Sequence, residues 1–478
     1  MRSTTFSIYI LSCHLFMLMA NENSAQDYSP LTKQFISVQA DTIALTHALV
    51  VDGTGGLPKA NQTIIITKGY IMNVGGSDKI KIPASAKVID CMNKTVIPGM
   101  IMMHEHLFYG ESVPPQYLGL EMPVSFPRLY LAGGVTTMRT AGSVETYTDL
   151  NIRNHINEGK IPGPHIDVTA PYIERAGLPI PEVYFIKNTD DAEQNMYYWI
   201  GKECTSFKVY MDITKADLAM VTKVAHEHNM KVTGHLCSIT YREAADLGID
   251  NLEHGFWVSS DFDKTKKENQ CNGPAQGASI RSLVEKSPEM KELMAYLIKK
   301  NVTITSTLPV FEPYTDREVF PGDGGEALTP VIRETIEKNY ATNVGKDSAA
   351  RAMFKKELAW EKQFVDMGGR LVAGIDPTGA GRVIPGYADR HIPELLVEAG
   401  FTFPQAIKIC TLNAAEYLSK DSERGTIEKG KRADLVLING DPTKDVKAMR
   451  NTEVVFKNGV GFDSRKLFES VKGKVGLY

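Results

Sequence analysis

The chain has 478 residues, of which 43% are hydrophobic and 23% are charged, and its formal net charge is −4. This composition is typical of a soluble globular protein, and the length is sufficient for one large barrel with a smaller domain. No basic tract and no interleaving of basic with aromatic residues occurs, which argues against nucleic acid as a partner.

Residues 1–25 have the pattern of a secretory signal peptide. Arg2 precedes an apolar run over residues 6–20, and polar residues follow at 21–24. The run is too short and too interrupted for a comfortable membrane span. We therefore expect a secreted or periplasmic protein that has no integral membrane span after signal removal. Cys13 follows Ile-Leu-Ser as in lipoprotein signals, but the apolar residues continue beyond it, which argues against a lipid anchor.

Five cysteines lie beyond this segment, at Cys91, Cys204, Cys237, Cys271 and Cys410. The odd count and the absence of a Cys-x-x-Cys pair argue against a disulfide scaffold and a zinc ribbon. One or two disulfides are compatible with an oxidising compartment, and the sequence leaves their pairing open. For Cys237 we expect a small buried side chain.

Short alternating strands separated by glycine-rich turns follow the signal segment. They are expected at residues 35–39, 42–51, 63–67, 70–74 and 87–90. Strands at 425–438 and 452–457 end the chain in the same style. We expect the two ends, 27–97 and 420–478, to form one small antiparallel β-sandwich domain.

Between these ends, residues 98–419 alternate short apolar strands with helical stretches, which is typical of repeated βα units. Eight strands are expected, at 100–106, 135–139, 165–169, 206–211, 230–235, 251–254, 302–306 and 371–375. The predicted fold is therefore α/β, a (β/α)8 TIM barrel, whose chemistry lies at the carboxyl ends of its strands.

Two long segments interrupt the alternation of strands and helices. Residues 110–127 contain four prolines, and residues 259–276 are polar. Both follow strand ends, so we expect them to lie over the barrel mouth as lids or specificity loops. For the second segment, a solvated insertion is the alternative.

The stretch from Val96 to Tyr109 carries the strongest functional signal. Its apolar run ends in His104-Glu105-His106. On a strand, residues i and i+2 point to the same face, so both imidazoles would project together at the strand's carboxyl end. Such a pair is half of a metal site.

His226 and His228 provide an internal comparison, because they have the same spacing. They lie in residues 215–229, where the apolar residues recur with helical period. On a helix, residues two apart do not face each other. We therefore expect both on a helix surface rather than in a metal site.

Four more polar residues lie on or end other predicted strands. Lys208 lies in the fourth, and His235, His254 and Asp376 end the fifth, sixth and eighth. With the histidine pair of the first strand, they would converge on one barrel mouth. Imidazoles and a carboxylate suit a divalent ion such as Zn²⁺.

Each of these residue types has a chemical role in such a site. A buried lysine readily loses its proton, and the neutral amine of Lys208 can take up CO₂ as a carbamate that bridges two ions about 3.5–4 Å apart. Metal ions lower the pKa of bound water and so provide hydroxide near neutral pH. Asp376 would take the proton of this water and pass it to a leaving nitrogen.

Other interpretations stay open for several of these residues. Lys208 could pair with a carboxylate or contact substrate, and Asp376 could be a turn residue because a proline follows it. His235 and His254 could be core histidines. His165 begins a strand instead of ending one, so we expect it to be structural.

His391 lies in a helical stretch beyond the eighth strand, where we expect packing or a place on the rim. Tyr210 has the same strand face as Lys208 and could reach substrate or pack in the core. Arg175 and Arg382 could hold a substrate carboxylate through a bidentate contact, or lie on the surface.

Taken together, these patterns resemble the amidohydrolase superfamily, and they extend over nearly the whole predicted mature chain. The nearest branch is that of the imidazolonepropionase-like and Xaa-Pro or Xaa-Arg dipeptidase-like enzymes. The motifs that carry the resemblance are Val96-Ile-Pro-Gly…His104-x-His106, Gly134-Val-Thr-Thr-Met-Arg139, Leu252-Glu-His-Gly255, Ala373-Gly-Ile-Asp376, Glu394-Leu-Leu-Val-Glu-Ala-Gly400, Thr411-Leu-Asn-Ala-Ala415 and Gly425…Gly430-Lys-Arg-Ala-Asp-Leu435.

The resemblance implies a set of metal ligands and two divalent ions, most often zinc. The implied ligands are His104, His106, His235, His254, Asp376 as ligand and proton shuttle, and Lys208 as a carboxylated bridging lysine. The chain departs from its relatives at Met102 and Thr140, where they often have Asp, so support of the ligands differs. Residues 172–177 replace a Gly-Gly-His-type loop, which puts dipeptide specificity in doubt.

The leading hypothesis is a binuclear metal-dependent hydrolase of a C–N amide bond in a small molecule, other than a peptidase of large proteins. The substrate would be a dipeptide, an N-acyl amino acid or a cyclic amide. The alternative is a mononuclear enzyme that deaminates or opens a heterocycle. Such relatives commonly carry a Glu soon after His235, whereas the first here is Glu243. A non-enzymatic binding protein is the third reading, and a homo-oligomer is compatible with the sequence.

Overall fold

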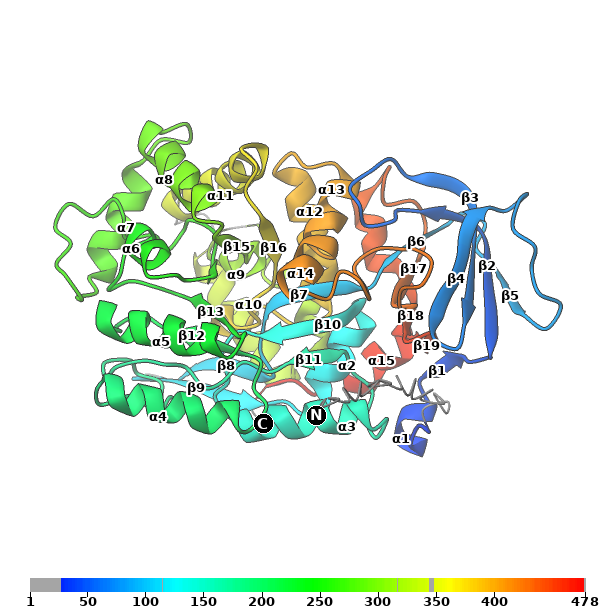
Figure 1. Cartoon of the computed structure of the whole chain (residues 1–478), viewed down its shortest axis with the longest axis horizontal. Coiled ribbons are helices and arrows are strands. Elements are labelled where there is room, and N and C mark those ends of the chain that lie inside the picture. Colours follow the sequence, from blue (N-terminus) through cyan, green and yellow to red (C-terminus); the bar gives the residue numbers. More distant parts are fainter. Residues whose placement is uncertain (1–26, 114, 316, 344–347, 477–478) are drawn as a thin grey trace, which may run out of the picture.

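The computed structural model describes residues 27–113, 115–315, 317–343 and 348–476 (Figure 1). The predicted signal segment, residues 1–25, lies outside this part of the chain. Within it, no helix combines the length and apolar character needed to cross a membrane.

Eight parallel strands occupy the middle of the chain, and all eight were predicted. They fall into two sheets of order β11-β10-β7 and β12-β13-β14-β15-β16. Their bounds are β7 (Met100–Glu105), β10 (Val135–Thr140), β11 (His165–Asp167), β12 (Ser206–Val209), β13 (Lys231–Gly234), β14 (Asn251–Leu252), β15 (Thr303–Ser306) and β16 (Leu371–Ala373). β7 and β10 are buried along their whole lengths, which agrees with the apolar run Met100–Met103 at the start of β7.

Two contacts connect these sheets at their edges. An isolated parallel bridge pairs Thr169 with Ser206, just beyond β11 and at the start of β12. At the other edge, the N–H of Asp376 donates to the carbonyl of His104 at 2.9 Å, which links the end of β16 to β7. The strands nevertheless belong to two sheets, so a closed eight-stranded barrel stays a prediction.

Helices connect most of these strands, as the alternating sequence predicted. From β10 to β15 they are α3 (Thr146–Asn157), α4 (Thr189–Ile200), α5 (Lys215–Glu227), α6 (Tyr241–Asp246), α7 (Gly273–Ser282) and α8 (Pro288–Lys299). The helical period in α5 is confirmed, because Leu218, Val221 and Val224 are buried. A capping box of Thr214 and Asp217 fixes its start.

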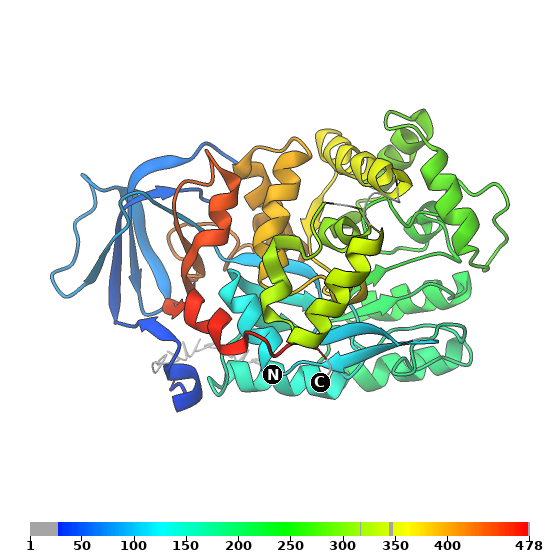
Figure 2. The same cartoon turned by 180° about the vertical axis from the view of Figure 1, so that it is seen from behind.

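The remaining helices flank the ends of this region. They are α2 (Ser125–Ala132), α9 (Leu308–Phe311), α10 (Pro330–Asn343), α11 (Ser348–Asp366), α12 (Tyr387–Glu398), α13 (Phe403–Ile409), α14 (Leu412–Tyr417) and α15 (Ser464–Val471), with a short α1 (Pro30–Lys33). Seen from behind, α10 (yellow-green), α12 (orange) and α15 (red) lie in front of the parallel strands (Figure 2).

A nine-stranded sheet joins the two chain ends, as predicted, and lies to one side of the parallel strands (Figure 1). Its order is β1-β19-β18-β17-β6-β2-β3-β4, and β5 also pairs with β2. Its strands are β1 (Ile36–Val38), β2 (Thr42–Val50), β3 (Lys59–Thr67), β4 (Tyr70–Gly76), β5 (Lys87–Asp90), β6 (Lys94–Pro98), β17 (Leu435–Asn439), β18 (Thr452–Lys457) and β19 (Val460–Asp463).

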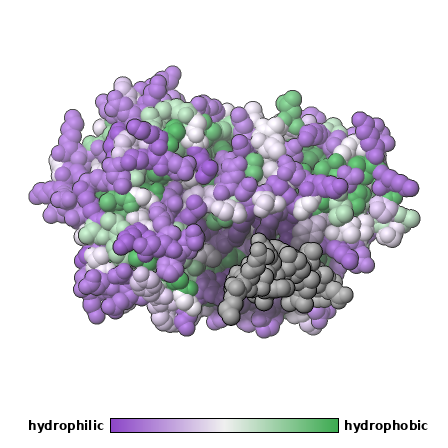
Figure 3. Space-filling model, in the orientation of Figure 1, coloured by the Kyte–Doolittle hydropathy of each residue, from purple (hydrophilic) through white to green (hydrophobic). Residues whose placement is uncertain are grey.

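The sheet differs from the predicted antiparallel unit in one respect. β2 pairs in parallel with β5 along its first half and with β6 along its second half, so the unit is mixed. All nine strands belong to one sheet, and a sandwich of two sheets stays a prediction. In the face drawn in Figure 3, hydrophobic residues form small patches on a mostly hydrophilic surface, one of them over this sheet.

The first long segment was predicted as a loop, and the structure corrects this. Residues 108–121 form a hairpin of β8 (Phe108–Val113) and β9 (Gln116–Glu121), in which Gly110 pairs with Gly119. Prolines near the hairpin tip hid this strand pair, because they read as loop signals. The expectation that the segment covers the site is taken up below.

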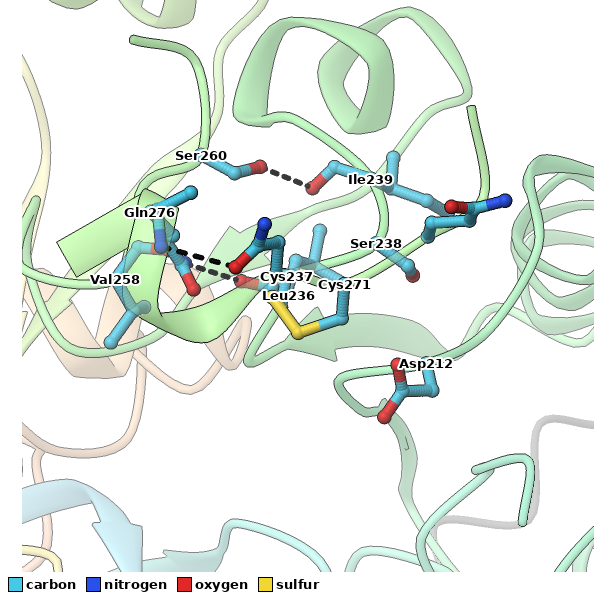
Figure 4. The surroundings of a disulfide bond; sticks show 12 residues. Asp212, Leu236, Cys237, Ser238, Ile239, Val258, Ser260, Cys271 and Gln276 are labelled. Carbon is cyan, nitrogen blue, oxygen red and sulfur yellow. Dashed lines mark hydrogen bonds between the residues drawn. A yellow bond between two sulfur atoms is a disulfide. The ribbon is translucent and has the colours of Figure 1, made fainter. Parts of the chain in front are cut away.

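The second long segment is held by a disulfide between Cys237 and Cys271 (Figure 4). Cys237 is buried, as expected, and its pairing with Cys271 is one that the sequence left open. The partners are 34 residues apart in sequence, and only the return of the segment to the end of β13 brings them together. Cys91, Cys204 and Cys410 are free and buried.

Candidate functional site

The two histidines of the first parallel strand lie together, as their spacing predicted. His104 is 2% and His106 3% exposed, and their ring centroids are 5.4 Å apart. Glu105 points to the other side, where its Oε1 accepts a hydrogen bond from the N–H of Ile375 at 3.1 Å. Strand alternation therefore places both imidazoles at one end of the parallel strands.

His235 and His254 follow β13 and β14 and complete a row of imidazoles. The His254 ring centroid lies 4.5 Å from that of His235 and 4.6 Å from that of His104. Burial lowers the pKa of His104 to about 4 and that of His235 to about 3. Neutral imidazole is the form that binds metal ions.

Asp376 brings a carboxylate to these rings from the end of β16. Its Oδ1 lies 3.5 Å from Nε2 of His106, and its Oδ2 lies 3.8 Å from Nε2 of His104 and 3.9 Å from Nδ1 of His254. These separations are too long for hydrogen bonds. They match atoms that share one ion at about 2 Å from each.

One group of residues meets the geometric requirement for a metal site among the described residues. The ligand atoms of His104, His254 and Asp376 all lie within 4.8 Å of one another. Both His254 and Asp376 have positive φ, 67° and 48°. Non-glycine residues rarely adopt this conformation, and it concentrates at functional sites. The donor set therefore fits a divalent ion.

Lys208 lies on β12 beside this group and is 1% exposed. Burial lowers its pKa to about 8. Its Nζ is 3.9 Å from Oε1 of Glu253. Lys208 therefore also has a carboxylate neighbour, which was the alternative that the sequence left open. Lys208 lines the same pocket as His104, His106 and His254.

Glu253 is a residue of the site that the sequence analysis missed. It is fully buried, and its Oε2 lies 2.8 Å from Nδ1 of His104. Its Oε1 accepts hydrogen bonds from Arg139 at 2.6 Å and from Thr233. Its position immediately before His254 was the available sequence signal.

Other contacts hold the remaining imidazoles. Nδ1 of His106 lies 3.2 Å from the carbonyl oxygen of Gly142, and Nδ1 of His254 lies 2.9 Å from Oγ1 of Thr307. For His104 and His106, these Nδ1 contacts leave Nε2 facing the pocket. Such outer contacts fix ring orientation and raise ligand basicity.

A pocket of about 290 Å³ opens above these side chains. It is lined by His104, His106, Phe108, Tyr117, Gly119, Val144, Tyr172, Leu178, Pro179, Ile180, Val183, Lys208, Tyr210, Met211, His254, Tyr314, Asp376, Thr378 and Gly379. Tyr210 is therefore in reach of a bound molecule, and its ring centroid lies 4.9 Å from that of His235. The hairpin contributes Phe108, Tyr117 and Gly119, as expected for a segment over the site.

Arg175 lies beside Asp217, outside the lining of the pocket. Its guanidinium forms two hydrogen bonds with the carboxylate of Asp217, at 2.8 and 2.9 Å, and it is not among the pocket-lining residues. The geometry gives no support for a contact with substrate, because its fork is already satisfied. Arg382 lies over the ring of Tyr314, 5.5 Å from its centroid.

The other histidines lie where the sequence placed them. His226 and His228 are exposed at the end of α5. His165 begins β11. His391 is buried on α12, with Nε2 2.8 Å from Oε2 of Glu312.

Residues 361–461 match the model of the amidohydrolase family. The chain is 37% identical to the enamidase of Eubacterium barkeri over 82 residues. The aligned stretch makes up 17% of this chain and 20% of that protein. It is also 37% identical to the imidazolonepropionase of Psychromonas ingrahamii over 72 residues. This stretch makes up 14% of this chain and 18% of that protein. The alignments thus span about a fifth of these relatives.

Solved structures resemble the fold over most of the chain. A Xaa-Pro dipeptidase with bound methionine has a TM-score of 0.65 at 18% identity, over 88% of this chain and 100% of that one. The ochratoxinase of A. niger has a TM-score of 0.63 at 16% identity, over 89% of this chain and 96% of that one. The resemblance to the amidohydrolase superfamily is confirmed.

Proposed function

We propose that the chain is a metal-dependent hydrolase that cleaves a C–N amide bond in a small molecule. One observation carries the proposal: the ligand atoms of His104, His254 and Asp376 gather at the floor of a small pocket. The amidohydrolase-family match at residues 361–461 supports the same reaction class.

The proposed site would hold two divalent ions, and zinc is the expected metal. His104, His106, His235, His254 and Asp376 would supply protein ligands, and a carbamate on Lys208 would bridge the ions. The lowered pKa of Lys208 supports this role, because carbamate forms from the neutral amine. When bound, such ions lower the pKa of water and polarise the scissile carbonyl.

Asp376 would act as the proton shuttle of the reaction. It removes a proton from the attacking water and delivers it to the leaving nitrogen. Its carboxylate reaches the pocket from the end of β16 and is close to three imidazoles. Tyr210 lines the same pocket and would contact substrate.

The proposed substrates are dipeptides, N-acyl amino acids and cyclic amides. A pocket of about 290 Å³ fits a small molecule and not a folded protein. The alternative is a mononuclear deaminase or an enzyme that opens a heterocycle. Glu243, the first Glu after His235, bonds to Thr240 and Lys215 at the start of α6, which leaves that chemistry without its proton donor.

We also propose that the two parallel sheets act as one (β/α)8 barrel over residues 98–419, flanked by a β-sandwich from 27–97 and 420–478. The bridge between Thr169 and Ser206 and the contact between Asp376 and His104 support closure. The protein would be secreted or periplasmic after loss of residues 1–25. The disulfide at Cys237 supports an oxidising compartment.

The direct test compares wild type with Asp376→Asn on a panel of dipeptides, N-acyl amino acids and cyclic amides. Release of amine is measured for linear amides and ring opening for cyclic ones, with metal content determined in parallel. Wild type should hydrolyse at least one class of amide. Asp376→Asn should be inactive while metal stays bound. The control variant Asp366→Asn, at the exposed end of α11, should behave as wild type. Activity in Asp376→Asn, or none in wild type, would refute the proposal.

A further inference from the structure

The hairpin over the pocket carries a buried hydroxyl with no well-formed hydrogen bond. Oη of Tyr117, on β9, is buried and has no partner of good hydrogen-bond geometry among the described residues. It interacts weakly with the side chain of Thr378 and with the charge of Asp376. The hydroxyl of Thr378 instead donates to Oδ1 of Asp376 at 3.1 Å. Buried hydroxyls are normally paired, so this one is available to a ligand.

Two glycines make room for side chains on this face of the hairpin, Gly110 for Tyr117 and Gly119 for Phe108. Gly110 and Gly119 face each other across the hairpin. A Cβ at Gly110 would run into the hydroxyl of Tyr117, and a Cβ at Gly119 would lie 3.2 Å from the ring of Phe108. Phe108, Gly110, Tyr117 and Gly119 share one face of the hairpin, because they alternate along both strands. That face is the one over the pocket.

The pocket wall beside Tyr117 is apolar. Leu178, Pro179, Ile180 and Val183 line it, and the N–H of Tyr117 donates to the carbonyl of Pro179 at 2.8 Å, which ties the hairpin to this wall. Apart from the histidines, the lining residues that carry a charge are Lys208 and Asp376, both on the floor. A charged group lying against the wall would lose its hydration without gaining a partner.

We propose that Tyr117 binds substrate, with its hydroxyl donating a hydrogen bond to the oxygen of an amide. The rest of the substrate is an uncharged apolar or aromatic group that lies against Phe108 and the 178–183 wall. A phenol is protonated at neutral pH and can donate in this way. The inference rests on the proposed function and narrows its substrate class toward amides with an apolar acyl group.

The test measures binding and does not need turnover. Isothermal titration calorimetry would compare benzamide with 4-carbamoylbenzoate, which adds a carboxylate at the far end of the ring, on the protein as purified. Wild type should bind benzamide at least roughly tenfold more tightly, because the carboxylate would meet the apolar wall. Tyr117→Phe should weaken benzamide binding roughly tenfold, the effect of losing one hydrogen bond. Tyr296→Phe, which removes the hydroxyl that bonds to Asp246 on α6, is the matched control.

Gly110→Ala provides a second test that leaves the phenol intact. The added methyl should displace Tyr117 and weaken benzamide binding to a similar extent. The double variant Gly110→Ala with Tyr117→Phe should bind benzamide about as tightly as either single variant, because both substitutions remove the contact of the same hydroxyl. A full additive loss would mean that Gly110 acts independently of the hydroxyl and would overturn the account.

The remaining outcomes separate this inference from the proposed function. Unchanged binding in Tyr117→Phe, or no binding of benzamide by wild type, would overturn the inference. If wild type and Tyr117→Phe hydrolyse amides with equal efficiency, the inference would be overturned, whereas the proposed function would be supported. Binding of benzamide that depends on Tyr117, without hydrolysis of any amide in the panel, would support the inference and refute the function.

Discussion

Nδ1 of His104 lies 2.8 Å from Oε2 of Glu253, and both side chains are buried. This contact turns Nε2 of His104 toward Asp376. Burial would raise the pKa of Glu253, but the positive charge of Lys208 and those of its other neighbours hold it well below the usual value. An ionised Glu253 therefore orients a proposed metal ligand.

Replacing Glu253 by Gln should lower metal affinity about 10- to 100-fold, as loss of an outer contact to a ligating histidine does. Competition with a chelating dye measures this directly. Glu312→Gln is the matched control. Oε2 of Glu312 lies 2.8 Å from Nε2 of His391, the same distance as in the His104 contact, but this pair lies outside the pocket. Equal metal affinity in Glu253→Gln and wild type would show that the contact does not orient the ligand.

His391 should make stability depend on pH at the alkaline side. Burial lowers its pKa, but hydrogen bonds to Glu312 and Glu394 raise it to about 9. Because the folded pKa exceeds the unfolded value of about 6.5, the stabilisation is complete below pH 6.5 and is lost as pH rises through 9.

The loss should be on the order of 3 kcal/mol, because the folded and unfolded pKa values differ by about 2.5 and each pKa unit corresponds to 1.36 kcal/mol. Urea unfolding of wild type and His391→Gln at pH 6, 8 and 10 would measure it. The difference between the two proteins should shrink as pH rises. A difference that stays constant over this range would contradict the assignment.

Loss of the disulfide should destabilise the protein without changing metal binding. The bridge between Cys237 and Cys271 closes a loop with a sequence separation of 34. Chain entropy then predicts a loss of about 3–4 kcal/mol in the free energy of unfolding for Cys271→Ser. Denaturant titration with and without reductant measures it. If wild type under reducing conditions unfolds at the same denaturant concentration as under oxidising ones, the bridge does not stabilise the fold.

Gly374 provides a test of how closely β16 approaches β7. A Cβ at Gly374 would lie 2.7 Å from Cα of His104, which is too close for the strands to stay in place. Gly374→Ala should cost roughly 1–3 kcal/mol of stability and displace His104, so metal content should fall. Gly273→Ala, where the Cβ would meet nothing within 4 Å, should leave both unchanged. Normal metal content in Gly374→Ala would refute this packing.

The parallel strands and the main site residues could be predicted from the sequence because each signal is local. Strand β7 is an unbroken apolar run, and the spacing of His104 and His106 fixes their common face. His235, His254 and Asp376 each end a short apolar strand. Parallel strands that end at one edge bring such residues together, whatever connects them.

What the sequence did not predict depends on contacts between distant segments. Glu253 looked like an ordinary strand residue until His104 and Arg139 lay beside it. Cys237 meets Cys271 only when the long segment folds back. Arg175 was a candidate for substrate binding because its partner Asp217, 42 residues away, could not be identified by spacing.

Metal content per chain tests the central claim most directly. Wild type, Lys208→Met and Lys457→Met would be purified without chelator and measured by plasma mass spectrometry. Lys457 is the matched control: it is also buried, and its Nζ donates to the carbonyl of Gly163 at 2.8 Å, outside the pocket. We predict about two ions in wild type and Lys457→Met, and about one or none in Lys208→Met. The same metal content in wild type and Lys208→Met would contradict the lysine-bridged binuclear site.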